Sequence, residues 1–145
     1  MPIKLRVDGI PVAASRPRFS IVRGRGHAYT DAKYRAYQAL LHQEYRHQYQ
    51  GKPLEGPVYV KLDVFRKIQK SISKQERVKR LSHVHRPLVK PDVDNYFKSV
   101  TDACTGLIWH DDAQVVSETT NKYYSENPRI EIEVGRIDEL KQPEA

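Results

Sequence analysis

Alternation of apolar and polar residues marks three segments of this chain of 145 residues. It covers residues 3–7, 58–64 and 130–134, and such a period of two predicts half-buried strands. Residues 115–124 read as a further strand because they are rich in Val, Thr and Tyr. We therefore expect a β-sheet built from segments at both ends and in the middle of the chain.

Helical spacing is clearest between the first two predicted strands. The apolar residues from Tyr34 to Tyr45 recur every three or four positions, Thr30 or Asp31 can cap the N-terminus, and Gly51 ends the run. This pattern predicts one long helix that packs on the sheet.

A second helix is expected from residue 95 to about residue 104, where Gly106 follows. Between residues 8 and 30, the prolines and glycines are expected to break regular structure. The basic segment 66–90 has no firm period, so a short helix over 73–81 and a mobile loop both stay open.

Strands and helices together predict an α/β (α+β) fold. We expect a single compact domain over residues 1–145, with a mixed β-sheet and flanking helices, because no repeat or linker divides the chain. Residues 137–145 read as a polar tail.

Composition narrows the cellular setting. The single cysteine, Cys104, excludes an intramolecular disulfide and favours a reducing compartment. No apolar run approaches the ~20 residues of a membrane span, and the N-terminus does not read as a signal peptide. We therefore expect a cytoplasmic protein with no membrane partner.

The net charge of +7 conceals two opposite halves. Residues 1–90 carry 20 basic and 6 acidic residues, whereas residues 91–145 carry 5 basic and 12 acidic ones. The first part is therefore a polycation with a charge of +14. Such asymmetry suggests a nucleic-acid partner, with a solvated face and a disordered basic loop as the equal alternative.

Chemistry concentrates in the segment KPDVDNYFKSVTDACTGLIWHDDAQVV. Asp92 and Asp94 lie two positions apart before the second helix, and Asp111 and Asp112 follow it. A helix that turns back onto the sheet would bring both pairs together, and converging carboxylates suit one or two Mg²⁺ ions. Each pair has a plainer alternative as a helix cap or a turn.

Lys98 follows Asp94 by four positions on the same helix. We expect its ammonium group to point toward the carboxylates, where it could bind a phosphate or stabilise developing charge. The alternative is a surface ion pair with Asp94 or with Asp102.

This segment resembles the signature of the RusA family of Holliday junction resolvases, which reads approximately D-x-D-N-x-x-K-x-x-x-D-A, then Gly, then D-D-x-Q. A weaker resemblance covers most of the chain. It implies a crossover junction endodeoxyribonuclease that acts in DNA recombination and repair. Such an enzyme is a homodimer, depends on Mg²⁺ (with Mn²⁺ as a substitute), and cuts a four-way junction by paired symmetric phosphodiester hydrolysis.

Individual roles follow from the motif positions. The resemblance makes Asp92, Asp94 and Asp112 the metal-binding catalytic residues and Lys98 the catalytic lysine. Asp111 is a further metal candidate, whereas Asn95 and Gln114 match motif positions without a defined role.

DNA binding is expected from two basic clusters, since such side chains contact phosphates and carry little sequence information. They are Arg16, Arg18, Arg23 and Arg25 in one, and Lys67, Lys70, Lys74, Arg77, Lys79 and Arg80 in the other. Near the first cluster, Phe19, Tyr29 and Tyr34 are candidates to stack at a branch point, or else belong to the core.

Three other functions stay open at this point. One is a less selective nuclease for flaps or other branched DNA, and another is a junction-binding module without catalysis. A sugar-nucleotide transferase that uses the D-x-D motif leaves the basic segments without a role.

Overall fold

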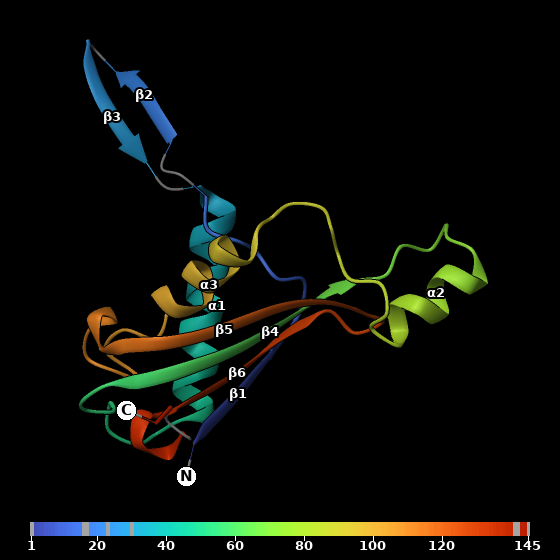
Figure 1. Ribbon diagram of the computed structural model, residues 1–145. Helices are drawn as coiled ribbons and strands as arrows, with labels where there is room; N and C mark the ends of the chain where they lie inside the picture. Colours follow the sequence, from blue (N-terminus) through green and yellow to red (C-terminus); the bar gives the residue numbers. More distant parts are fainter. Residues whose placement is uncertain (1, 16–17, 23, 30, 141–142, 145) are drawn as a thin grey trace.

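Four strands form the central sheet, in the order β1-β6-β4-β5. They are β1 (Ile3–Asp8), β4 (Val58–Lys67), β5 (Val115–Ser125) and β6 (Arg129–Arg136). β4 and β5 run parallel, whereas β6 pairs antiparallel with both β1 and β4. The computed structural model describes residues 2–15, 18–22, 24–29, 31–140 and 143–144, and it confirms the mixed sheet (Figure 1).

Apolar residues line up across three strands to form the core. Leu5 of β1 faces Ile132 of β6, which faces Leu62 of β4, and all three side chains are buried. Because side chains alternate between the faces of a strand, this register gives the sheet one apolar face. Each fully buried aliphatic side chain contributes roughly 1.5–3 kcal/mol relative to an exposed one.

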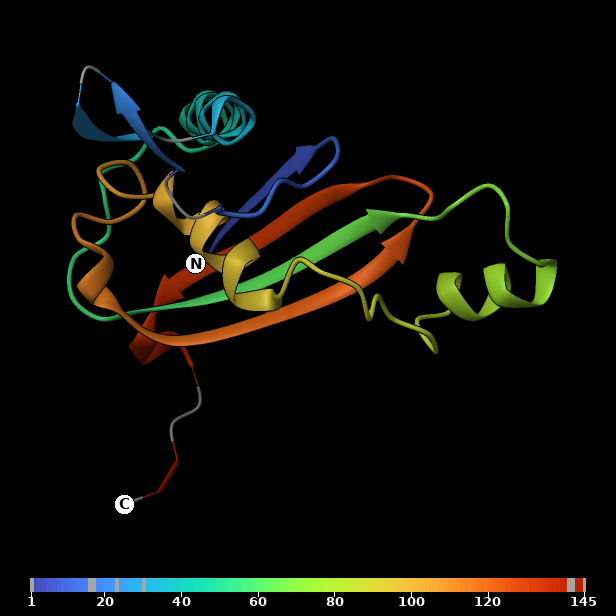
Figure 2. The ribbon, with the colours of Figure 1, turned by 90° about the horizontal axis from the view of Figure 1, so that it is seen from above.

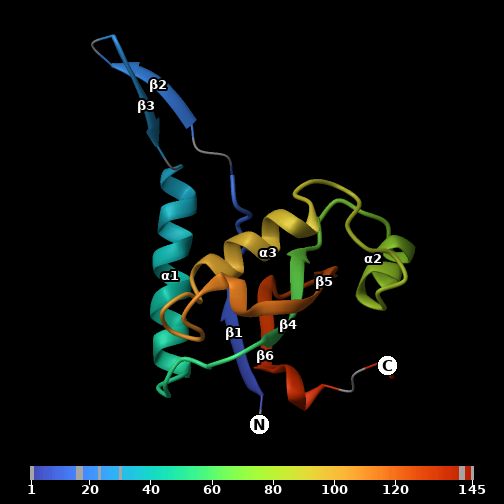
Figure 3. The same ribbon diagram turned by 60° about the vertical axis from the view of Figure 1, so that its left-hand side comes forward.

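Two helices cover that apolar face, as Figure 2 shows. They are α1 (Ala32–Gln48) and α3 (Val93–Asp102). Tyr37, Leu41 and Tyr45 are the buried residues of α1, and the Tyr45 hydroxyl donates a hydrogen bond of 2.9 Å to the carbonyl of Val100 in α3. The two helices therefore lie against each other as well as against the sheet (Figure 3).

Two further elements project from this body (Figure 1). A hairpin of β2 (Arg18–Val22) and β3 (Arg25–Tyr29) occupies the segment expected to be irregular, so that expectation was wrong. Gly24, with φ +75°, lies between the two strands and takes a left-handed conformation that suits glycine in a tight turn. The prolines and glycines therefore delimit a hairpin instead of an irregular loop.

Helix α2 (Lys74–Leu81) settles the open question about the basic segment in favour of a helix. The Ser73 side chain caps it by accepting a 3.1 Å hydrogen bond from the backbone N–H of Glu76. Two 3-10 turns, η1 (Asp112–Gln114) and η2 (Ile137–Glu139), complete the described secondary structure. Among the described residues, none of the helices has the length and apolar character needed to cross a bilayer.

Candidate active site

Helix α3 begins at Val93, two residues earlier than expected, with Asp92 as its N-cap and Asp94 in its first turn. Both side chains are exposed, and neither carboxylate makes a hydrogen bond or ion pair with any residue that the structure describes. The partial positive charge of the helix N-terminus stabilises anions at both positions. Two carboxylates without a described partner therefore lie on the surface at the start of one helix.

Two cationic side chains of the sheet donate hydrogen bonds to backbone carbonyls of the segment that precedes Asp92. Lys122 of β5 donates through Nζ to the carbonyls of Val89 and Pro91, both at 3.1 Å. Arg66 of β4 donates to the Lys90 carbonyl at 3.4 Å. Sequence reasoning missed both residues, because nothing in their spacing shows that neighbouring parallel strands place them under this segment.

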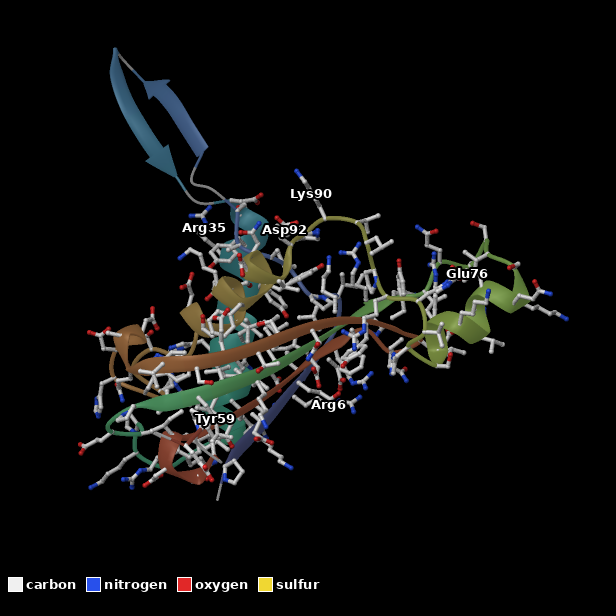
Figure 4. All side chains as sticks on the ribbon, in the orientation of Figure 1. Arg6, Arg35, Tyr59, Glu76, Lys90 and Asp92 are labelled. Carbon is white, nitrogen blue, oxygen red and sulfur yellow. The ribbon has the colours of Figure 1, made fainter. Side chains whose placement is uncertain are left out.

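Arg66 also reaches the helix itself. Its Nη1 donates to the Tyr96 hydroxyl at 2.6 Å, and Tyr96 is almost fully buried. The guanidinium therefore joins the end of β4 to both the incoming segment and the first turns of α3. In Figure 4, Lys90 and Asp92 lie above the sheet in the view, at the start of α3.

Lys98 points away from the helix N-terminus, contrary to expectation. Its Nζ lies 3.4 Å from an Asp102 carboxylate oxygen, one helical turn further on, while the side chain remains 64 % exposed. Asp102 also accepts a hydrogen bond of 2.5 Å from the Tyr34 hydroxyl of α1. The surface ion pair considered as the alternative is therefore the one observed.

Tyr34 is half-buried, and its hydroxyl is engaged with Asp102. Burial, reinforced by that hydrogen bond to a carboxylate, raises the pKa of Tyr34 above its ordinary value. Tyr34 therefore joins α1 to α3. The side chains of Phe19 and Tyr29, the other two stacking candidates, lie outside the described residues.

Asp111 and Gln114 act together as a cap of η1. An Asp111 carboxylate oxygen accepts from the Ala113 N–H at 2.9 Å, and the Gln114 side-chain oxygen accepts from the N–H of His110 and of Asp111. The Gln114 amide also donates to the carbonyls of Leu54 and Gly56. One carboxylate oxygen of Asp111 thus completes a capping box, and its assignment as a further metal candidate stays a prediction.

Asp112 satisfies a buried donor next to that cap. One carboxylate oxygen accepts a 3.0 Å hydrogen bond from the indole N–H of Trp109, which is fully buried, and a 2.6 Å bond from the Thr105 hydroxyl. Gly106, with φ +85°, allows the tight turn between Thr105 and Trp109. The Asp112 carboxylate is therefore part of the packing at the C-terminal side of α3.

The structure of this single chain does not bring Asp92, Asp94 and Asp112 together. Within the described ranges, no group of three or more Asp, Glu, His or Cys side chains is placed to hold a metal ion. Helix α3, about 15 Å long at 1.5 Å per residue, separates the first two aspartates from η1 (Figure 1). The expected convergence of the two acidic pairs is thus corrected.

Asp92 and Asp94 alone still provide a donor set that suits Mg²⁺. This ion prefers oxygen ligands and is commonly held by one or two carboxylates, with water and substrate phosphate as its other ligands. Both aspartates have unengaged carboxylates within the described part of the chain, whereas Asp112 does not fit the same site.

The second basic cluster divides into two kinds of residue. Arg77 pairs with Glu126 and donates at 3.1 Å to the Gln69 carbonyl, and the Arg80 guanidinium lies 4.2 Å from the centroid of the Tyr124 ring. These two arginines attach α2 to residues of the sheet and its turns, and their assignment to DNA stays a prediction. The lysines of the cluster are exposed and have no ion pair with any described residue: Lys67, Lys70, Lys74 and Lys79.

Glu76 adds a polar contact on the same helix. It accepts from His85 Nδ1 at 2.7 Å and lies 3.6 Å from Arg80 Nε. The hydrogen bond from His85, together with nearby positive charge, lowers the pKa of Glu76.

In the first basic cluster, Arg16 and Arg23 and the side chains of Arg18 and Arg25 lie outside the described residues.

Comparison with known proteins identifies the family. The family model described as "Endodeoxyribonuclease RusA" matches residues 8–135, which is most of the chain. The chain belongs to the RusA family. A relative from Bacillus subtilis (strain 168), named "Uncharacterized protein YqaN", is 41 % identical over 140 residues, which are 93 % of this chain and 96 % of the relative.

Membership of the RusA family confirms the resemblance found in the sequence and makes the chain a DNA endonuclease. The matched region contains β4, β5, α3 and almost all of β6, but only Asp8 of β1, so the family motif lies on the sheet and helix described above. Asp92 and Asp94 are the aspartates of that motif whose carboxylates have no partner among the described residues of this RusA-family chain.

Proposed function

We propose that the chain is a Mg²⁺-dependent, structure-selective endodeoxyribonuclease that resolves Holliday junctions by paired symmetric cuts. The observation that carries the proposal is the pair of open carboxylates, Asp92 and Asp94, at the start of α3 in a RusA-family fold. Family membership supports the nuclease, and the basic composition of residues 1–90 supports a DNA substrate.

Asp92 and Asp94 would hold the metal ion. A bound Mg²⁺ supplies a water of lowered pKa and neutralises charge on the phosphate. Lys98, which is 64 % exposed, would add positive charge one turn further along the helix, at the cost of its ion pair with Asp102. Three exposed lysines of the second basic cluster, Lys70, Lys74 and Lys79, would hold the DNA arms through their phosphates.

A homodimer completes the proposal. A four-way junction has two-fold symmetry, so two identical sites related by a two-fold axis would deliver matched cuts on opposite strands. The hydrogen bonds from Trp109 and Thr105 fall on one carboxylate oxygen of Asp112, so its other oxygen would take part in metal binding if a rearrangement or a second chain brought it to the same ion.

A panel of synthetic DNA substrates tests the proposed function. A labelled four-way junction, a flap and a linear duplex of equal length are incubated with the protein in Mg²⁺, in Mn²⁺ and in EDTA. The proposal predicts that the junction is cut faster than the other two, with either metal, and that EDTA stops the reaction.

Two outcomes would contradict it. Equal cutting of flap and junction would indicate the less selective nuclease. Junction binding without product in either metal would indicate a binding module.

A further inference from the structure

A groove with a volume of about 640 Å³ lies directly beside the start of α3. It runs between the segment from Ile10 to Ser15, the end of β4 and the residues that flank Asp92 in sequence. Pro91 and Asn95 belong to its wall, so the groove opens next to the two carboxylates. Neither sequence reasoning nor the family motif assigned any role to it.

Two hydrogen bonds attach the apolar wall of the groove to helix α3. The N–H of Ala14 donates to the Asn95 carbonyl at 2.9 Å, and the Ser99 hydroxyl donates to the Val12 carbonyl at 2.6 Å. Ile10, at one end of this wall, is 66 % exposed. The wall therefore presents a firm, largely apolar surface to whatever occupies the groove.

The rest of the groove is cationic. Lys33 from the start of α1, Arg66 and Lys67 from the end of β4, and Lys90 before α3 line it, and none of its described lining residues is acidic. The three lysines are exposed and form no ion pair with a described residue. Like charges gathered from three separate elements repel one another, so a bound anion would stabilise this arrangement.

We infer that this groove binds an unpaired DNA strand adjacent to the phosphate that is cut, an inference that rests on the proposed function. A DNA strand alternates anionic phosphates with less polar sugars, which matches lysines beside an apolar wall. A cavity of this volume suits a small segment of one strand, since drug-sized ligands fill pockets of similar size.

The groove would follow the backbone of that strand without reading its bases. Tyr96 is the only aromatic residue in its described wall, and it is almost fully buried with its hydroxyl held by Arg66. No described ring is therefore free to stack on a base, and phosphate contacts alone carry no sequence information. We expect binding that depends strongly on salt and little on sequence.

The test uses the double variant Lys33→Ala/Lys67→Ala, which removes two groove charges. Its control, Lys4→Ala/Lys61→Ala, removes two exposed lysines of β1 and β4 that do not line the groove. Binding of a labelled oligothymidylate and of a linear duplex is measured without divalent metal at several salt concentrations. Thermal unfolding verifies that all three proteins are folded.

The inference predicts that only the groove variant loses affinity for oligothymidylate. Its slope of log affinity against log salt should become less steep by about 1.4, from two contacts of about 0.7 each on a single strand. An unchanged slope would overturn the inference, and so would an equal loss for duplex and single strand.

Cleavage separates this inference from the proposed function. If the wild-type protein cuts junctions while the groove variant binds oligothymidylate normally, the groove inference fails and the function stands. If the wild-type protein cuts no junction but the groove variant loses strand binding, the function fails and the groove is a strand-binding site.

Discussion

At the scale of single residues, the carboxylate of Asp112, which begins η1, has a structural role. The indole N–H of Trp109 is buried away from water, and a buried donor without an acceptor costs about 1–3 kcal/mol. Asp112 supplies that acceptor and also binds the Thr105 hydroxyl. The family motif places the same residue in the metal site, so the two roles require separate tests.

Substitutions at Asp112 distinguish these roles. Asp112→Asn keeps an acceptor oxygen and should leave the free energy of unfolding nearly unchanged, whereas Asp112→Ala should lower it by about 1–3 kcal/mol. Urea unfolding measures both values. Equal stability of Asp112→Ala and the wild-type protein would disprove the structural role.

Junction cleavage by the Asn variant then decides the catalytic role. Loss of cleavage in a stable Asp112→Asn protein would place Asp112 in the metal site despite its contacts in the single chain. Cleavage at the wild-type rate would restrict it to packing.

At the scale of elements, the segment before α3 is fixed by side chains from the sheet. Lys122 binds two of its carbonyls, and the second, that of Pro91, belongs to the peptide that joins Pro91 to Asp92. A hydrogen bond from a charged group contributes about 1.5–3 kcal/mol. Lys122 is therefore a positioning residue for the carboxylate of Asp92.

We predict that Lys122→Met lowers junction cleavage by about 10-fold to 100-fold, the range typical for groups that orient metal ligands. Affinity for the junction measured without metal should stay near the wild-type value, because Lys122 donates to the protein backbone. The concentration of Mg²⁺ needed for half-maximal cleavage should rise. Cleavage and metal dependence like those of the wild-type protein would contradict the positioning role.

The helix α2 shows why basic residues need structural placement before they are assigned to DNA. Arg80 is 17 % exposed in its side chain and lies over the Tyr124 ring, whereas Lys79, its neighbour, is exposed. A cation–π contact of this kind contributes about 1 kcal/mol. Of these adjacent residues on α2, Arg80 packs against the sheet and Lys79 is accessible to a ligand.

Arg80→Ala and Lys79→Ala form a matched pair. The first should lower the free energy of unfolding by about 1 kcal/mol. The second should leave stability unchanged and make the slope of log duplex affinity against log salt less steep by about 0.9. Unfolding curves and salt titrations measure the two effects, and the reverse assignment would refute this division of the basic cluster.

How far the sequence predicts these elements depends on where their stability originates. Alternation predicted β1, β4 and β6 because the core face of each strand is read directly from its own residues. Helix α2 stayed ambiguous because contacts such as Arg77 with Glu126 join residues 49 positions apart. The hairpin of β2 and β3 was missed because its prolines and glycines were read as breakers when they only delimit the strands.

The site shows the same limit. The sequence placed Asp92 and Asp94 at a helix start, but the direction of Lys98 depends on Asp102 and Tyr34, which come together only when α1 packs on α3. Likewise, the distance from these aspartates to Asp112 is set by the length of α3 and by the turn at Gly106.

At the scale of the whole molecule, charge and fold combine into one arrangement. Residues 1–90 carry the net positive charge, and the acidic residues lie mostly in the last part of the chain. The fold places the end of β4, with its cations, beside the start of α3, with its two open carboxylates. A cationic groove therefore adjoins an anionic site, which suits a metal-dependent enzyme acting on a polyanion.

The most direct test of this account is junction cleavage by Asp92→Asn beside its control, Asp8→Asn, which removes another exposed carboxylate, at the end of β1. A labelled four-way junction is incubated with each protein in Mg²⁺, and binding is measured in parallel. The account predicts paired symmetric cuts by the wild-type and Asp8→Asn proteins, and binding without cuts by Asp92→Asn. Cleavage by Asp92→Asn at the wild-type rate would contradict it.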